Sequence, residues 1–106
     1  MKPTYIEQVN DPKEWFLERT TVSRCLSVGP CFFQFLNVEP TSTQGDVVVR
    51  IYDGQNDQGV LKLTIKCVYS HCPVKLPQPA FFRRGLYVHL VTNAAAATLQ
   101  YLPLRD

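Results

Sequence analysis

Long apolar runs and clustered glycines are both missing from this sequence of 106 residues. No run of consecutive apolar residues approaches the ~20 that a membrane-spanning helix needs, and the first residues contain no apolar signal segment. The five glycines are scattered, so no glycine-rich loop is available to hold a phosphate. We therefore expect no membrane partner and no secretory route, and a protein that stays in a cytoplasm or in particles assembled there.

Histidine is scarce as well, and neither of the two copies has a base–nucleophile arrangement around it. His71 directly precedes Cys72, whereas a catalytic pair needs two side chains that face each other. His89 lies in a strand-like run, on the parity opposite to its apolar neighbours, which indicates a solvated side chain or a subunit contact. Asp53 and Asp57 fall among turn formers, where solvated roles are expected. The sequence therefore predicts no catalytic residues, no cofactor and no enzyme.

Cysteine occurs four times, but its spacing fits a zinc site poorly. Five residues separate Cys25 from Cys31 and four separate Cys67 from Cys72. The paired cysteine ligands of a structural zinc site are usually closer together in sequence. We expect buried or incidental thiols and no metal site. A local disulfide between Cys25 and Cys31, across the intervening Gly-Pro turn, is geometrically possible, so the redox state and pairing of the cysteines stay open here.

The net charge is also low, at +2. This is too small to attract nucleic acid, so we expect no nucleic-acid partner. The distribution is uneven, because residues 1–60 hold five Lys or Arg against eight Asp or Glu, and residues 61–106 hold six against one. An acidic first part and a basic second part suit contacts between copies of the chain.

The sequence does contain a series of short β-prone runs separated by turn formers. The clearest alternation is at residues 60–67, where the apolar side chains from Leu61 to Cys67 are expected inward and the lysines outward. Prolines make residues 73–79 irregular or an edge, and Ala94–Ala97 is expected to be a connecting loop or the start of a strand. This spacing is typical of a single antiparallel β-sandwich or small barrel. Strands are expected at residues 20–28, 31–38, 46–52, 60–67, 86–91 and 98–102, giving an all-β domain of six to seven strands over residues 19–106.

Residues 1–18 differ from this pattern and are interpreted as an extended N-terminal arm. Asp11 followed by Pro12 is a good helix start, so the arm has room for a short helical turn that presents Trp15 and Phe16. An arm with such aromatics is best explained by packing against a neighbouring subunit.

The second candidate contact is the aromatic and basic cluster of Phe81, Phe82, Arg83 and Arg84. Neighbouring side chains of an extended segment face opposite ways, so one phenylalanine is expected in the core and the other at the surface. Aromatic residues and arginine are enriched where proteins bind one another. The candidate partner-interface residues are therefore Trp15, Phe16, Phe81, Phe82, Arg83 and Arg84.

The order of the β-prone runs resembles small virion proteins of tailed bacteriophages. The resemblance covers residues 46–103 and is carried by four pieces: Asp46–Gly54 (DVVVRIYDG), Leu61–Ile65 (LKLTI), Gly85–Asn93 (GLYVHLVTN) and Leu99–Pro103 (LQYLP). It implies a compact β-sandwich in the virion, serving as a capsid decoration or cement subunit. The implied partners are the major capsid protein or another virion protein, and further copies of the chain, with a trimer favoured.

Two other functions stay open at this point. The first is a head–tail connector or tail component, which is also structural. The second is a small module that binds a ligand or a host protein, which predicts a stable monomer with one concave apolar site. The position in the virion, the oligomer symmetry and the host stay undetermined.

Overall fold

The computed structural model describes residues 15–41, 45–68 and 72–104, and all of its regular structure is β-strand. The all-β prediction is therefore confirmed, with eight strands in place of six to seven. None of the described residues belongs to a helix long and apolar enough to cross a membrane. The strands are β1 (Phe16–Thr20), β2 (Arg24–Ser27), β3 (Cys31–Pro40), β4 (Asp46–Asp53), β5 (Val60–Val68), β6 (Cys72–Phe82), β7 (Leu86–Thr92) and β8 (Ala94–Pro103).

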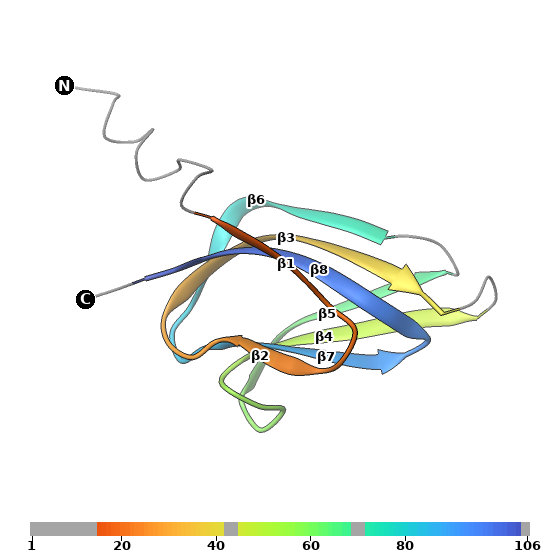
Figure 1. Cartoon of the computed structure of the whole chain (residues 1–106), viewed down its shortest axis with the longest axis horizontal. Coiled ribbons are helices and arrows are strands. Elements are labelled where there is room, and N and C mark those ends of the chain that lie inside the picture. The colour runs from red at the N-terminus through yellow and green to blue at the C-terminus, as the bar shows by residue number, and fades with distance from the viewer. Residues whose placement is uncertain (1–14, 42–44, 69–71, 105–106) are drawn as a thin grey trace.

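The strands form two antiparallel four-stranded sheets that lie face to face (Figure 1). One sheet has the order β1-β8-β3-β6, and the other has the order β2-β7-β4-β5. This pair of orders is the topology of a jelly roll, an eight-stranded sandwich built from two Greek keys. Every neighbouring pair of strands is therefore far apart in sequence, except β4 and β5, which form a hairpin.

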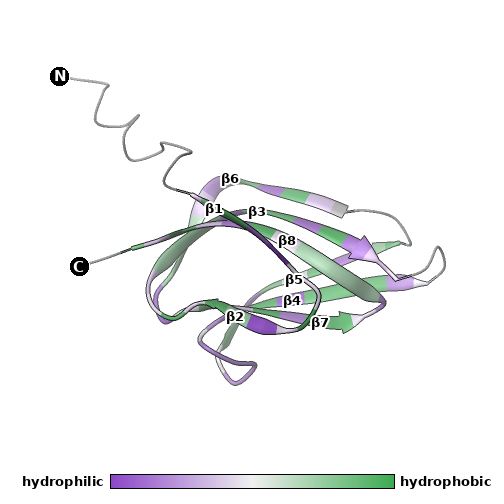
Figure 2. Cartoon of the chain, viewed as in Figure 1, coloured by the Kyte–Doolittle hydropathy of each residue, from purple (hydrophilic) through white to green (hydrophobic). Residues whose placement is uncertain are grey.

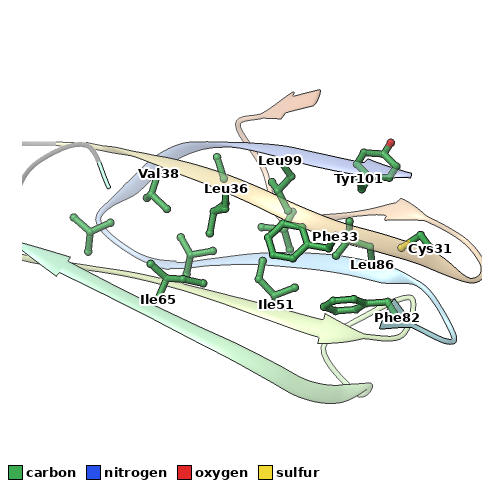
Figure 3. Close-up of a cluster of buried hydrophobic side chains, with 14 residues drawn as sticks. Cys31, Phe33, Leu36, Val38, Ile51, Ile65, Phe82, Leu86, Leu99 and Tyr101 are labelled. Carbon is green, nitrogen blue, oxygen red and sulfur yellow. The ribbon is translucent and has the colours of Figure 1, made fainter. Parts of the chain in front are cut away.

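The core lies between the sheets and follows from the alternation of side chains along each strand. Along β4, Val47, Val49 and Ile51 are buried while the residues between them are more exposed. Apolar and polar residues alternate in the same way along other strands (Figure 2). Phe33 and Phe82 meet edge to face at one end of the core, with ring centroids 5.9 Å apart (Figure 3).

The expected end of the arm at residue 18 is wrong, because β1 begins at Phe16. Its register pairs Phe16 with Tyr101 and Thr20 with Ala97, so residues 16–18 belong to the sandwich. The local Asp-Pro sequence favoured a helical turn here, but pairing with β8 determines the conformation. A local sequence pattern carries no information about a partner strand that is distant in sequence. Residues 1–14 of the expected arm lie outside the described residues.

Two other segments are settled by the structure. Residues 94–97, expected as a loop or the start of a strand, open β8, and Ala96 and Ala97 are fully buried. The turn before them is made by Asn93, whose φ of 53° is left-handed. Leu61, expected inward, is exposed because a bulge opposite Ile51 and Tyr52 shifts the register of β5. The proline-rich run forms β6, and its place at the edge of its sheet agrees with the prediction.

Candidate functional site

The structure separates the two phenylalanines of the aromatic and basic cluster. Phe82 has no exposed surface and packs in the core, whereas Phe81 is 47% exposed on the other face of β6. The predicted split between a core and a surface phenylalanine is therefore confirmed. Phe81 can contact a partner directly, and Phe82 supports the strand that presents it.

Phe81 belongs to a line of apolar side chains that crosses the outer face of the β1-β8-β3-β6 sheet. It pairs with Phe32 on β3, and Phe32 pairs with Leu102 on β8. The Phe32 and Phe81 rings lie 5.6 Å apart. Trp15 directly precedes β1, one residue before the Phe16–Tyr101 pair. We call Leu102, Phe32 and Phe81 the apolar row.

Of the residues that the sequence indicated as interface candidates, Phe81 belongs to the apolar row. Trp15, Leu102 and Phe32 are half-buried, and Phe81 is exposed. Phe16 lies on the opposite side of its strand, exposed at the sheet edge, with its ring edge to face against Tyr101 at 5.6 Å. Sequence reasoning missed Phe32 and Leu102. Phe32 stands between two apolar residues, so no local alternation shows which way it faces, and only the register shows that Phe32 adjoins Phe81 and Leu102.

Arg83 and Arg84 lie in the turn between β6 and β7, directly after the apolar row ends at Phe81. Asp53 holds this turn, because its Oδ2 accepts a hydrogen bond from the Arg83 N–H at 3.1 Å and its Oδ1 accepts one from the Arg84 N–H at 2.7 Å. Both arginines are exposed. The expectation that Asp53 is solvated is wrong, since it is only 9% exposed.

Gly85 allows the turn between β6 and β7 to contact the loop between β4 and β5. Its φ is 151°, and a Cβ there would stand 2.7 Å from the Gly54 carbonyl oxygen and 2.8 Å from that of Ser27. Its own carbonyl oxygen accepts a hydrogen bond from the Gly54 N–H at 3.2 Å. The contact fixes the arginine-bearing turn beside the apolar row, so the aromatic and basic side chains are presented from one rigid end of the sandwich.

The outer face of the second sheet carries a cluster of rings. Tyr52, Tyr87 and His89 lie with their ring centroids 6.2 to 6.4 Å apart. His89 is half-buried, and Arg50 is its cross-strand neighbour. His89 Nδ1 and Arg50 Nε are buried without a hydrogen-bond partner among the described residues. Because protein covers both atoms, neither is open to a ligand in this conformation.

Cys25 and Cys31 are free thiols that lie within the packed structure. Burial raises the pKa of Cys31 to about 11, and burial also raises the pKa of Cys25, whose Sγ donates to the Ser27 carbonyl oxygen at 3.1 Å. Both therefore stay protonated at neutral pH and are weak nucleophiles and poor metal ligands. Within the described ranges no three His, Cys, Asp or Glu side chains come together as a metal site. His71 and the side chain of Cys72 lie outside the description.

Comparisons with protein-family models, with curated proteins and with solved structures found no match. The function is therefore inferred from the surfaces that the chain itself presents.

Proposed function

We propose that this protein is a structural subunit of a phage particle, a capsid decoration or cement protein that docks through the apolar row. The single observation that carries the proposal is the line of Leu102, Phe32 and Phe81 across three neighbouring strands, β8, β3 and β6, with an exposed aromatic ring at its end. A line of large apolar side chains on a surface is typical of a site that a partner covers.

The composition of the site supports a protein partner. Interface centres are enriched in aromatic residues and arginine, and here the aromatic rings are followed directly by the exposed Arg83 and Arg84. The partner is the major capsid protein or another virion protein, together with further copies of the chain, most simply as a trimer. Each contact can be modest, because copies held on a lattice bind with increased avidity.

The fold is consistent with this role by analogy only. Eight-stranded jelly rolls recur in viral capsid proteins, but they also occur in lectins and in enzymes. The resemblance of residues 46–103 to small virion proteins supports a role in a phage particle. The apolar row supplies the surface through which the protein would dock.

The test is co-sedimentation with assembled phage particles, followed by counting of bound copies. A copy number that scales with the capsid lattice is expected. A copy number equal to one ring would instead assign the protein to the head–tail connector or the tail. A stable monomer that does not bind particles would overturn the proposal and favour a ligand- or host-protein-binding module.

A further inference from the structure

The chain itself contains a segment whose composition matches the apolar row, and this segment joins the fold beside the row. Trp15 directly precedes Phe16, and Phe16 pairs with Tyr101, the residue before Leu102. The chain therefore enters the sandwich next to the β8 end of the apolar row (Figure 1). Residues 1–14 precede this point in the sequence and lie outside the described residues.

The matching segment is residues 5–11, with the sequence YIEQVND. Its large apolar residues are Tyr5, Ile6 and Val9, and its charged residues are Glu7 and Asp11. The segment thus combines three large apolar side chains with two carboxylates and has no basic residue. The apolar row likewise has three large apolar side chains.

The surface beside the apolar row carries the opposite charge. Arg83 and Arg84 follow Phe81 by two and three residues, and both are exposed. Neither guanidinium forms an ion pair with another described residue. An acidic partner therefore gains charge contacts at this end of the row, and a basic partner is repelled there.

The length of the chain favours the row of a neighbouring copy over the row of the same copy. The row crosses two strand spacings, roughly 10 Å, which about three extended residues can span. The three residues before Trp15 are Pro12, Lys13 and Glu14, which bring no large apolar side chain to the row of their own copy. Val9 stands six positions before Trp15. Six residues of chain reach up to roughly 20 Å, which is beyond the far end of the row.

We propose that residues 5–11 of one copy bind the apolar row of a neighbouring copy. The apolar side chains of the segment cover the row, and its two carboxylates face Arg83 and Arg84. The two halves of this contact are different surfaces, so it joins copies head to tail and can close into a ring such as the proposed trimer. The contact rests on the proposed function of the apolar row, since it specifies how copies of the chain meet there.

The experiment uses two full-length variants, each damaged on one side of the contact. The segment variant carries Ile6→Asp and Val9→Asp, and the row variant carries Phe81→Asp. Light scattering after size-exclusion chromatography should show the unchanged chain as an oligomer and each variant as a monomer. An equimolar mixture of the variants should form a 1:1 complex, because the row variant still has its segment and the segment variant still has its row.

The matched control for the row variant is Val91→Asp, which places the same charge on an exposed residue of the other sheet. This control should leave the oligomer unchanged. The double variant Arg83→Glu, Arg84→Glu tests the charges without altering the apolar row.

A capped peptide of residues 1–14 tests the contact directly. It should bind the segment variant saturably, and added salt should weaken the binding. The affinity should fall about tenfold when the segment variant also carries Arg83→Glu and Arg84→Glu, as expected for the loss of two exposed charge contacts.

Other outcomes would overturn the proposal. These are a monomeric unchanged chain, an oligomer that persists in the segment variant, no 1:1 complex although both variants melt as folded chains, or equal peptide binding with and without Phe81→Asp. The experiment contains no particles, so its failure is distinguishable from failure of the proposed virion role. Particle binding that depends on Phe81, without any binding of the peptide, would retain that role and exclude this contact.

Discussion

At the scale of single residues, Asp53 shows how a side chain in a turn-rich run can act as a structural anchor. Its carboxylate accepts hydrogen bonds from two backbone N–H groups, at positions 30 and 31 residues away in sequence. Charge-assisted bonds of this kind are stronger than neutral ones, and a buried N–H left without a partner is costly. Asp53 therefore couples the end of β4 to the arginine-bearing turn.

We expect Asp53→Ala to lower the free energy of unfolding by about 2 to 3 kcal/mol, because it leaves two backbone donors unpaired. Urea denaturation measures this loss. Asp57→Ala, in the same loop but exposed, is the matched control and should change stability by less than about 0.5 kcal/mol. Equal effects of the two substitutions would show that Asp53 has no anchoring role.

Cys31 and Tyr101 make stability sensitive to alkaline pH. Burial raises the pKa of Cys31 from 9.0 to about 11. The pKa of Tyr101 is also raised well above its usual range, first by burial and then by Glu18, whose Oε1 accepts a hydrogen bond from the Tyr101 hydroxyl at 2.6 Å. Both groups stay protonated in the folded chain at a pH where the unfolded chain loses the protons.

We therefore expect these two groups to leave the free energy of unfolding constant around neutral pH. The free energy of unfolding should fall as pH rises from 9 to about 11, because the unfolded chain loses the Cys31 proton first. Tyr101 should add to this fall from about pH 10 upward. Denaturation series at fixed pH values measure the slope. Cys31→Ala should flatten the slope between pH 9 and 11 while lowering stability at neutral pH. An unchanged slope in this variant would contradict the assignment to Cys31.

At the scale of secondary-structure elements, β6 has a structural role on one face and a proposed binding role on the other. Its core face carries Phe82 against Phe33, and its outer face carries Phe81 at the end of the apolar row. The two phenylalanines are adjacent in sequence and chemically identical, so they form an internal comparison.

We expect Phe82→Ala to cost about 3 to 5 kcal/mol, because it leaves a cavity in the core. Phe81→Ala should cost only about 1 kcal/mol, the scale of its ring contact with Phe32. Chemical denaturation of both variants tests this ranking. In the particle assay the Phe81 variant should lose binding while still folded, and retention of full affinity would remove Phe81 from the interface.

At the scale of the whole molecule, the topology brings the apolar row and the arginine-bearing turn together. Phe81 pairs with Phe32 near the end of β6, and Arg83 and Arg84 follow in the turn to β7. In the proposed role, repeated contacts through this surface would gain avidity when copies are held on a lattice.

We expect the double variant Arg83→Glu, Arg84→Glu to weaken binding to particles while changing stability by less than about 1 kcal/mol, as surface substitutions usually do. Both arginine backbones would still donate to Asp53, so the turn is retained. A thermal melt and a particle-binding assay on the same preparation separate the two effects. Unchanged binding would place the interface elsewhere, with the 53–59 loop as the next candidate.

The sequence by itself determined the class of fold and the direction of many side chains. The β-prone runs at residues 46–52 and 60–67, separated by turn formers, predicted two consecutive strands, and adjacency alone predicted that Phe81 and Phe82 face opposite ways. These properties follow from the two-residue period of a strand, which is a local constraint.

Tertiary structure decided which strands are neighbours, and it therefore decided where the proposed binding surface lies. Residues 16–18 became part of β1, and Phe32 came to lie between Leu102 and Phe81, because strands distant in sequence paired in one register. Alternation states which face of a sheet a residue occupies, but many registers share the same alternation. Only the packing of the complete core selects one register, and this selection brings Leu102, Phe32 and Phe81 together on one face.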